Sequence, residues 1–73
     1  MKENDLVALL VDLPGEGLRR GDVGTVIEVF RKNAHHPGGY LLEFVEETGA
    51  VYAHANITDE SQLVQLRFKR EAA

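Results

Sequence analysis

The chain has 73 residues, no cysteine and a net charge of −4 at pH 7. This length fits a single domain, expected over residues 1–73, and the lack of cysteine excludes disulfides and thiolate chemistry. Twelve acidic against eight basic residues argue against binding that depends on neutralising nucleic-acid phosphates. The longest apolar run, residues 6–11, is far shorter than the roughly 20 residues that span a bilayer. The start of the chain lacks the apolar segment of a signal peptide, so we expect a cytoplasmic protein without membrane contact.

Five segments are predicted to be β-strands. They cover residues 5–11, 24–32, 40–46, 50–57 and 62–68. β-branched and aromatic residues dominate the second segment, and a clean alternation of Val51, Ala53, Ala55 and Ile57 with polar or aromatic residues marks the fourth. Both patterns are typical of strands, and the second predicts one face toward the core. The ends, residues 1–4 and 69–73, are expected to be frayed tails.

Turn-forming residues separate these strands. Residues 12–21 are predicted to form one long loop, and residues 33–39 form a second loop rich in proline and glycine. Residues 47–49 are predicted to form a tight turn in which Gly49 takes a positive φ. A single 3-10 or helical turn is expected near residues 58–62, because Thr or Asp followed by acidic residues suits a helix start.

Five short strands in about 65 residues predict an all-β fold, a small SH3-like barrel of antiparallel strands. Partial closure of the barrel would protect the strand edges in so small a sheet. An OB-type barrel is the alternative, but it usually has a helix between the third and fourth strands, and residues 47–49 leave no room for one. We expect Phe44 and Phe68 in the core.

The entry to the second strand has a recognisable pattern, Gly-x-x-Gly-x-Val-x-x-Val. Gly21 and Gly24 are expected to allow a tight entry where a side chain would collide with the sheet. Val26 and Val29 can both face the core only if the strand bulges between them. This segment resembles the KOW-type turn of SH3-like domains.

A wider resemblance includes this segment. The chain resembles a family of small bacterial proteins that is known only as a domain of unknown function, with the pattern "DLPxxGLxxGDxGTVVEV" followed by "YxVEF", and the matching stretches are residues 5–10, 13–14, 17–18, 21–26 and 40–44. The resemblance covers residues 5–49. It implies an SH3-like fold and no assigned activity. The chain departs from the pattern in its longer loop at residues 33–39 and at His54 and Asn56.

The candidate partner-binding residues are arginines, tyrosines and histidines in loops or on polar strand faces. They are Arg19, Arg20, Tyr40, Tyr52, His35 and His36, together with the loops at 12–21 and 33–39. The two arginines are expected to meet acidic groups on a partner. The two tyrosines would share one exposed patch if the third and fourth strands pair, and tyrosine is favoured at protein interfaces.

No residue is assigned to catalysis, to a metal or to a cofactor. Adjacent histidines such as His35 and His36 point apart on an extended chain, so they are interpreted as a solvated pair. Glu43, Glu46 and Glu47 show no sign of converging on a cleft, as acid/base catalysis would require. The sequence also lacks a phosphate-binding loop and a nucleophile motif.

We therefore expect a protein that is not an enzyme but a protein-binding module, an accessory or regulatory partner of another protein. An antitoxin-like role fits its acidic charge if the partner is basic. The alternative is a KOW-like protein that binds RNA or the ribosome through basic clusters at residues 19–20, 31–32 and 67–70, although nucleic acid is the less favoured partner. Self-association through exposed strand edges is a third option.

Overall fold

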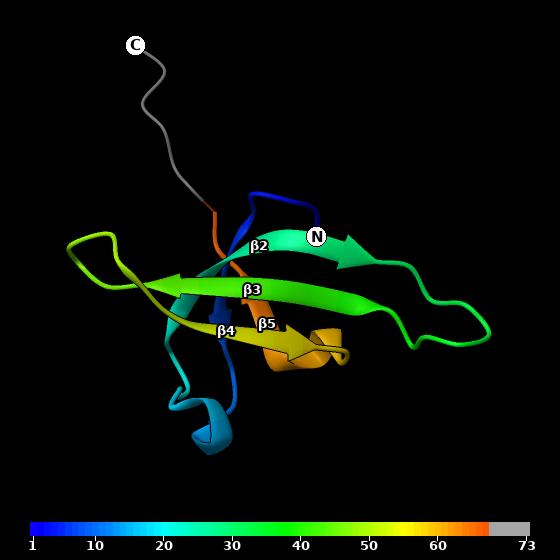
Figure 1. Cartoon of the computed structure of the whole chain (residues 1–73), viewed down its shortest axis with the longest axis horizontal. Helices are drawn as coiled ribbons and strands as arrows, with labels where there is room; N and C mark the ends of the chain where they lie inside the picture. The colour runs from blue at the N-terminus through cyan, green and yellow to red at the C-terminus, as the bar shows by residue number, and fades with distance from the viewer. Residues whose placement is uncertain (68–73) are drawn as a thin grey trace, which may run out of the picture.

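The structure, a computed structural model, describes residues 1–67. The predictions for Phe68 and for residues 69–73 lie outside this range. The described residues form five strands and two 3-10 turns, shown in Figure 1: β1 (Leu6–Leu9), η1 (Pro14–Glu16), β2 (Val23–Phe30), β3 (Gly39–Val45), β4 (Val51–Ile57), η2 (Glu60–Gln62) and β5 (Leu63–Gln65). None of the helical turns in these residues is long and apolar enough to cross a membrane.

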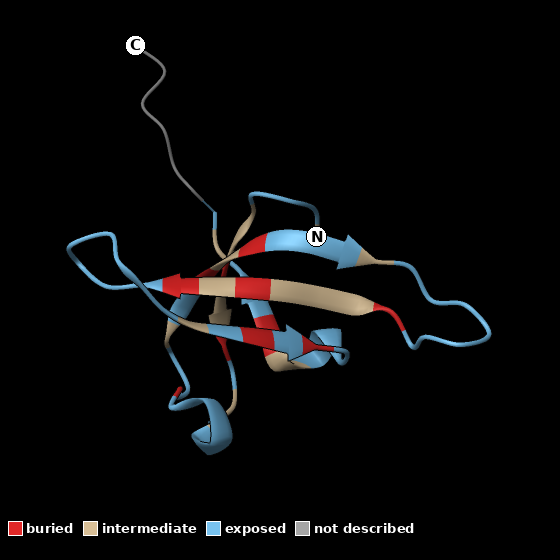
Figure 2. Ribbon diagram, in the orientation of Figure 1, coloured by how far each residue is buried: buried red, intermediate tan, exposed pale blue. Residues whose placement is uncertain are grey.

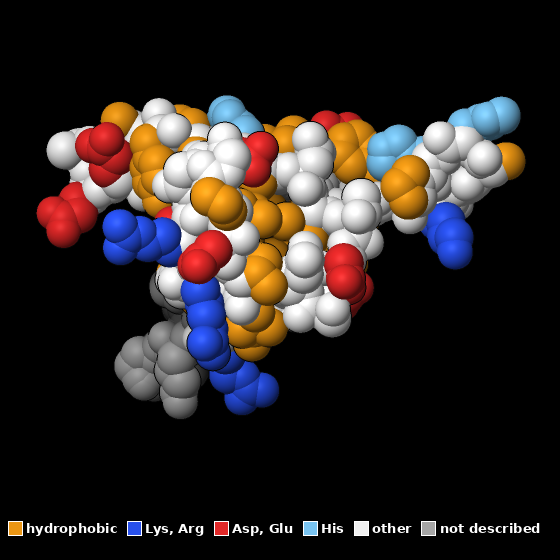
Figure 3. Space-filling model, turned by 90° about the horizontal axis from the view of Figure 1, so that it is seen from below, with side chains coloured by type: hydrophobic (Ala, Val, Ile, Leu, Met, Phe, Trp, Pro, Cys, Tyr) orange, Lys and Arg blue, Asp and Glu red, His pale blue; other side chains and the backbone are white. Residues whose placement is uncertain are grey.

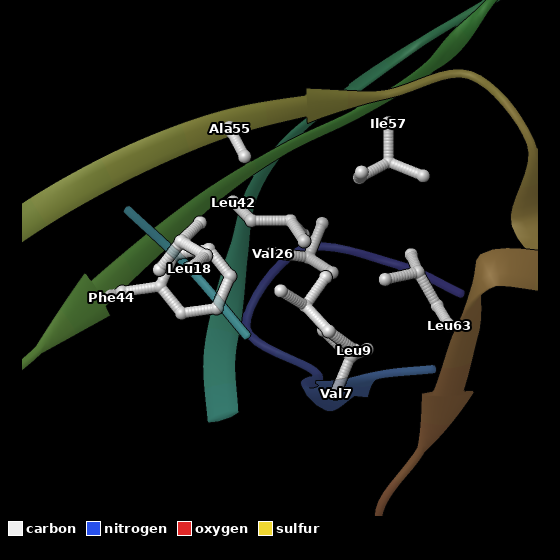
Figure 4. Close-up of a cluster of buried hydrophobic side chains, with 9 residues drawn as sticks. All are labelled: Val7, Leu9, Leu18, Val26, Leu42, Phe44, Ala55, Ile57 and Leu63. Atoms are coloured by element: carbon white, nitrogen blue, oxygen red, sulfur yellow. The ribbon is translucent and has the colours of Figure 1, made fainter. Parts of the chain in front are cut away.

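The strands form one antiparallel sheet in the order β4-β3-β2-β1-β5. The sheet folds over so that β1 and β5 lie across the core from β3 and β4 (Figure 4). This confirms the predicted all-β fold of five antiparallel strands with an SH3-like arrangement. The expected turn near residues 58–62 is η2, where Oδ1 of Asp59 accepts a hydrogen bond from the backbone N–H of Ser61 at 3.0 Å.

The core of the described residues is entirely apolar, with no buried polar or charged side chain. Its members come from every strand and from the loop after β1 (Figures 2 and 4): Val7, Leu9, Leu18, Val26, Leu42, Phe44, Ala55, Ile57 and Leu63. Alternate residues of β1 and β3 enter it, as the period of two predicts. Each fully buried Leu or Phe side chain stabilises such a core by about 1.5–3 kcal/mol.

A bulge interrupts the pairing of β2 with β3. The register shifts between Val26 and Glu28, so Val26 lies opposite Leu42 and Val29 lies opposite Tyr40. Because Leu42 and Tyr40 are two residues apart on β3, both valines face the same side of the sheet, as a bulge between them was expected to allow. Val29 nevertheless remains 39% exposed, since it lies beyond the stretch of β2 that pairs with β1.

The segment between β1 and β2 is not the single loop that was predicted for residues 12–21. It contains η1, and the backbone groups of Leu13 and Leu18 bond to each other at 2.9 and 3.0 Å. This bridge turns Leu18 into the core, where only 1% of it is exposed. Leu18 stands between a glycine and an arginine, outside any regular spacing of apolar residues, so the sequence pattern did not predict that it is buried.

The N-terminal residues 1–4 were expected to form a frayed tail, but in the structure they are tied to the sheet. The backbone N–H of Asn4 donates to the carbonyl oxygen of Val26 at 2.7 Å. Met1 packs against the core. The start of the chain therefore covers part of the barrel beside β2.

Glycine is required by close packing at one end of β2. A Cβ atom on Gly24 would lie 2.8 Å from a ring carbon of Phe44, closer than carbon atoms approach without displacement. The ring can lie over β2 only because this residue has no side chain. Gly21 and Gly49 have φ angles of 94° and 90°, which are left-handed conformations that favour glycine.

Candidate protein-binding surface

The six predicted partner-binding residues do not form one surface. They lie in two groups: Arg19, Arg20 and Tyr52 at the end of the sheet that carries the β3–β4 hairpin, and Tyr40, His35 and His36 at the end that carries the β2–β3 loop. These regions flank opposite ends of β2, which has eight residues and is therefore about 26 Å long. The surface expected to combine both loops is thus divided in two.

The two tyrosines show this separation directly. Tyr40 pairs with Ile57 at one end of the β3–β4 ladder, whereas Phe44 pairs with Ala53, the neighbour of Tyr52, near the other end. Four residues along a strand correspond to about 13 Å. Tyr40 and Tyr52 therefore do not share one exposed patch, although β3 and β4 pair as that expectation required.

Tyr40 connects β3 to η2. Its hydroxyl donates to Oε1 of Glu60 at 2.8 Å, and its ring packs against the core. The hydrogen bond to Glu60 raises the pKa of Tyr40 above 10.0, with desolvation and the negative charge of Glu60 adding to the effect. These contacts give Tyr40 a structural role in holding η2 against the sheet.

The two histidines lie in the β2–β3 loop, where His36 shapes the backbone. The backbone N–H of Gly38 donates to Nδ1 of His36 at 2.9 Å, and that of His35 donates to Oδ1 of Asn33 at 2.7 Å. The ring of His36 also lies 5.3 Å from that of Phe30. Within residues 1–67, no three His, Asp or Glu side chains gather where they could hold a metal ion.

Arg19 and Arg20 lie on an ordered loop. Oδ2 of Asp22 accepts from the backbone N–H of Arg19 at 2.9 Å, and Oδ1 of Asp12 accepts from that of Arg20 at 2.8 Å. Leu18 anchors the same loop in the core. Both arginines are exposed, and in the described part of the chain neither has a carboxylate within 4.0 Å of its guanidinium group. The loop therefore presents two cationic side chains without ion-pair partners.

The most exposed large apolar side chains of the described residues lie at the same end of the sheet. They are Val23 at 46% and Val45, Val51 and Tyr52 at 47% each. Val45 pairs with Val51. The register that pairs Thr25 with Glu43 continues to place Val23 opposite Val45. Because Val45 follows the buried Phe44 on β3, the three valines lie on the sheet face turned away from the core, and three neighbouring strands contribute to this apolar patch.

Sequence reasoning missed this patch because of a bulge in β4. The alternation placed Val51 on the core face with Ala53. In the structure the register shifts between Phe44 and Val45, so that Tyr52 is the extra residue and Val51 lies opposite the exposed Val45. A bulge changes which face the residues beyond it occupy. The departure from the predicted core face is therefore a consequence of strand pairing.

Tyr52, the extra residue of the bulge in β4, lies beside Phe44. Its ring is 6.4 Å from that of Phe44. Partial desolvation, followed by the negative charges of Asp22 and Glu46, raises the pKa of Tyr52. Asp22 belongs to the loop and Glu46 to the hairpin, so the negative charge of both elements acts on the phenol.

These residues define the hairpin-end surface. Figure 3 shows acidic side chains at the tip of the hairpin on the far left, with apolar and basic side chains next to them. Strand order brings the arginine-bearing loop and the hairpin to the same end of the sheet, because the loop joins β1 to β2 and the hairpin joins β3 to β4. The surface consists of Val23, Val45 and Val51 on the outer face of the sheet, and of Tyr52, Arg19, Arg20, Glu46 and Glu47 at the same end of the sheet.

The fold and this surface define a small all-β domain with an SH3-like strand arrangement and a patch of exposed apolar side chains. The chain belongs to the family described as Domain of unknown function (DUF4926), which matches residues 3–64. The resemblance to a domain-of-unknown-function family is thereby confirmed. No curated protein and no solved structure shows significant similarity to the chain.

Proposed function

We propose that this protein is a non-catalytic binding module that docks onto another protein chain through the hairpin-end surface. The observation that carries the proposal is the gathering of its four most exposed large apolar side chains at one end of the described sheet. Contiguous apolar surface on a small domain marks an interaction site. An accessory or regulatory role in the bacterial cytoplasm is the setting we propose for it.

The ordered loop favours binding at this surface. Asp12 and Asp22 hold the backbone of Arg19 and Arg20, so the loop has little conformational freedom left to lose when a partner docks. The guanidinium groups can then meet acidic groups on the partner, which gives orientation and speeds encounter. Tyr52 adds a rigid aromatic side chain of the kind enriched at interfaces.

RNA binding is the second function, and the distribution of basic residues favours it less. Arg19 and Arg20 precede β2, whereas Arg31 and Lys32 follow it, so these clusters are separated by the length of the strand. Phosphate contacts scale with the number of cations that reach the backbone. A titration with generic RNA at increasing salt tests this function, since steeply salt-dependent binding would favour RNA over a protein partner.

A pull-down from the native host tests the protein-binding proposal. The variant Val45→Lys places a charge at the centre of the hairpin-end surface and should lose the chain that co-purifies with the wild type. The matched control is Val29→Lys, at an exposed valine on the far end of β2, which should retain it. Both changes are at the surface and should alter the free energy of unfolding by about 0.5 kcal/mol or less. Equal recovery of the co-purifying chain with the two variants would contradict the proposal.

A further inference from the structure

We infer that the β2–β3 loop, residues 31–38, opens on mild acidification, because a hydrogen bond that closes it requires the neutral form of His36. The loop projects from the end of the sheet opposite the β3–β4 hairpin (Figure 1). The inference therefore goes beyond the proposed function and does not depend on it.

The bond that closes the loop uses a ring nitrogen as its acceptor. The backbone N–H of Gly38 donates to Nδ1 of His36 at 2.9 Å. A backbone N–H can only donate, so Nδ1 must carry a free lone pair and the ring must be neutral, with its proton on Nε2. Imidazole side chains take up a proton between about pH 5 and 8, and the imidazolium ion has no acceptor nitrogen. Protonation of His36 is therefore incompatible with this hydrogen bond.

Gly38 depends on this acceptor because it is buried, although it lies in a loop. A Cβ atom on Gly38 would lie 3.0 Å from the backbone nitrogen of Lys32 and 3.2 Å from the carbonyl oxygen of Phe30, so the backbone at the end of β2 lies against this residue. Without the acceptor on His36, a buried N–H would be left unpaired, which is a costly state for a backbone group. We therefore expect Gly38 to move away from β2, so that water can reach its N–H.

The same histidine also closes the preceding turn of the loop. The backbone N–H of Asn33 donates to the carbonyl oxygen of His36 at 2.8 Å, and that of His35 donates to Oδ1 of Asn33 at 2.7 Å. The main chain of His36 thus closes one turn, and its side chain ties that turn to the start of β3. Release of Gly38 therefore frees the connection between this turn and the sheet.

The contact between His36 and Phe30 does not require a neutral ring. The two ring centroids are 5.3 Å apart, and an aromatic ring accepts either a neutral or a cationic neighbour at this distance. The hydrogen bond to Gly38 is therefore the contact that a proton on His36 breaks.

The charges around the loop do not compensate that proton. The titratable and charged groups of the adjoining segments are Arg31, Lys32 and His35 in the loop, Glu28 on β2, Tyr40 on β3, and Asp59 and Glu60 at η2. Within residues 1–67 no carboxylate lies within 4.0 Å of the His36 ring nitrogens, since the ion pair found there joins His54 to Glu43. A proton on His36 thus adds positive charge next to two cationic residues, and their repulsion also favours an open loop.

Proton–nitrogen NMR spectra recorded between about pH 7.5 and about pH 5 test the inference. In the wild type, the amide proton of Gly38 should shift upfield as the ring signals of His36 titrate. Its protection from solvent exchange, corrected for the intrinsic exchange rate at each pH, should fall about tenfold. A Gly38 amide that stays unchanged while His36 titrates would overturn the inference.

Two substitutions of His36 separate the hydrogen bond from the ring. In His36→Asn, the amide oxygen takes the place of Nδ1 and accepts from the N–H two residues further on at every pH, so the Gly38 amide should stay protected throughout. In His36→Phe, a ring remains beside Phe30 but the acceptor is lost, so the Gly38 amide should be unprotected throughout. Protection in His36→Phe equal to that of the wild type at neutral pH would show that the bond does not hold the loop.

The matched control is His35→Gln/His54→Gln, which leaves His36 as the only histidine of the chain. Its Gly38 amide should respond to pH like that of the wild type. The inference is overturned if this control loses the response, or if His36→Asn keeps it, because the titrating group would then lie elsewhere.

Discussion

At the scale of single residues, contact between Gly24 and Phe44 controls how β2 approaches β3. A Cβ on Gly24 would meet the ring at 2.8 Å, and overpacking of this kind costs about 1–3 kcal/mol. Gly24→Ala should therefore lower the melting temperature by about 4–8 °C for each kcal/mol lost. Gly15→Ala is the control, because nothing lies within 4 Å of its Cβ position. Equal thermal melts for the two variants would show that the ring can move aside.

The tyrosine hydroxyls provide a second residue-scale prediction. The chain has two tyrosines and no tryptophan, so phenolate formation is readily followed by ultraviolet absorbance. Glu60→Gln removes the negative charge beside the Tyr40 hydroxyl, and the pKa of Tyr40 should move down toward 10.0. Tyr40→Phe leaves only the titration of Tyr52. An unchanged alkaline titration in Glu60→Gln would contradict the contact.

The sign of the pH effect follows from the direction of these shifts. Both tyrosines have raised pKa values in the folded protein. Their contribution to stability is therefore complete below the unfolded pKa of about 10 and is lost as the pH rises through the folded values. We expect stability to decline in strongly alkaline solution, and to decline less in Tyr40→Phe.

At the scale of elements, the connection between β1 and β2 joins the core to the candidate surface. Leu18 is buried while the next two residues are exposed. Leu18→Ala should reduce the free energy of unfolding by about 2–5 kcal/mol, because the site is left with a cavity. Urea denaturation measures the change, and Leu10→Ala, at a side chain that is 40% exposed, should cost much less. Similar losses in the two variants would show that Leu18 does not anchor the loop.

The strand elements themselves follow from local chemistry. The alternation of residues 50–57 and the β-branched run around Val26 predicted β4 and β2, and a bulge between Val26 and Val29 is present in the structure. The helical turn at η2 followed from capping chemistry at Asp59. Each of these signals lies within a few residues of the structure that it produces.

At the scale of the whole molecule, the hairpin-end surface exists only because strand order brings distant segments together. Val23, Val45 and Val51 are apolar residues in strands, and nothing in their neighbours in sequence separates them from core valines. Their exposure depends on how far the sheet folds over and on the bulge at Tyr52. Strand order likewise brings the loop with Arg19 and Arg20 and the hairpin with Glu46 and Glu47 to the same end of the sheet.

The amino-acid sequence by itself determined the fold class, the number of strands and most turns, because these depend on propensities and periodicities of short segments. The tertiary structure alone decided that Leu18 belongs to the core, that Tyr40 holds η2 and that Tyr52 lies beside Phe44. The physical reason is that burial and proximity depend on strand register and on how the sheet folds over. A one-residue bulge is enough to exchange an inward and an outward face.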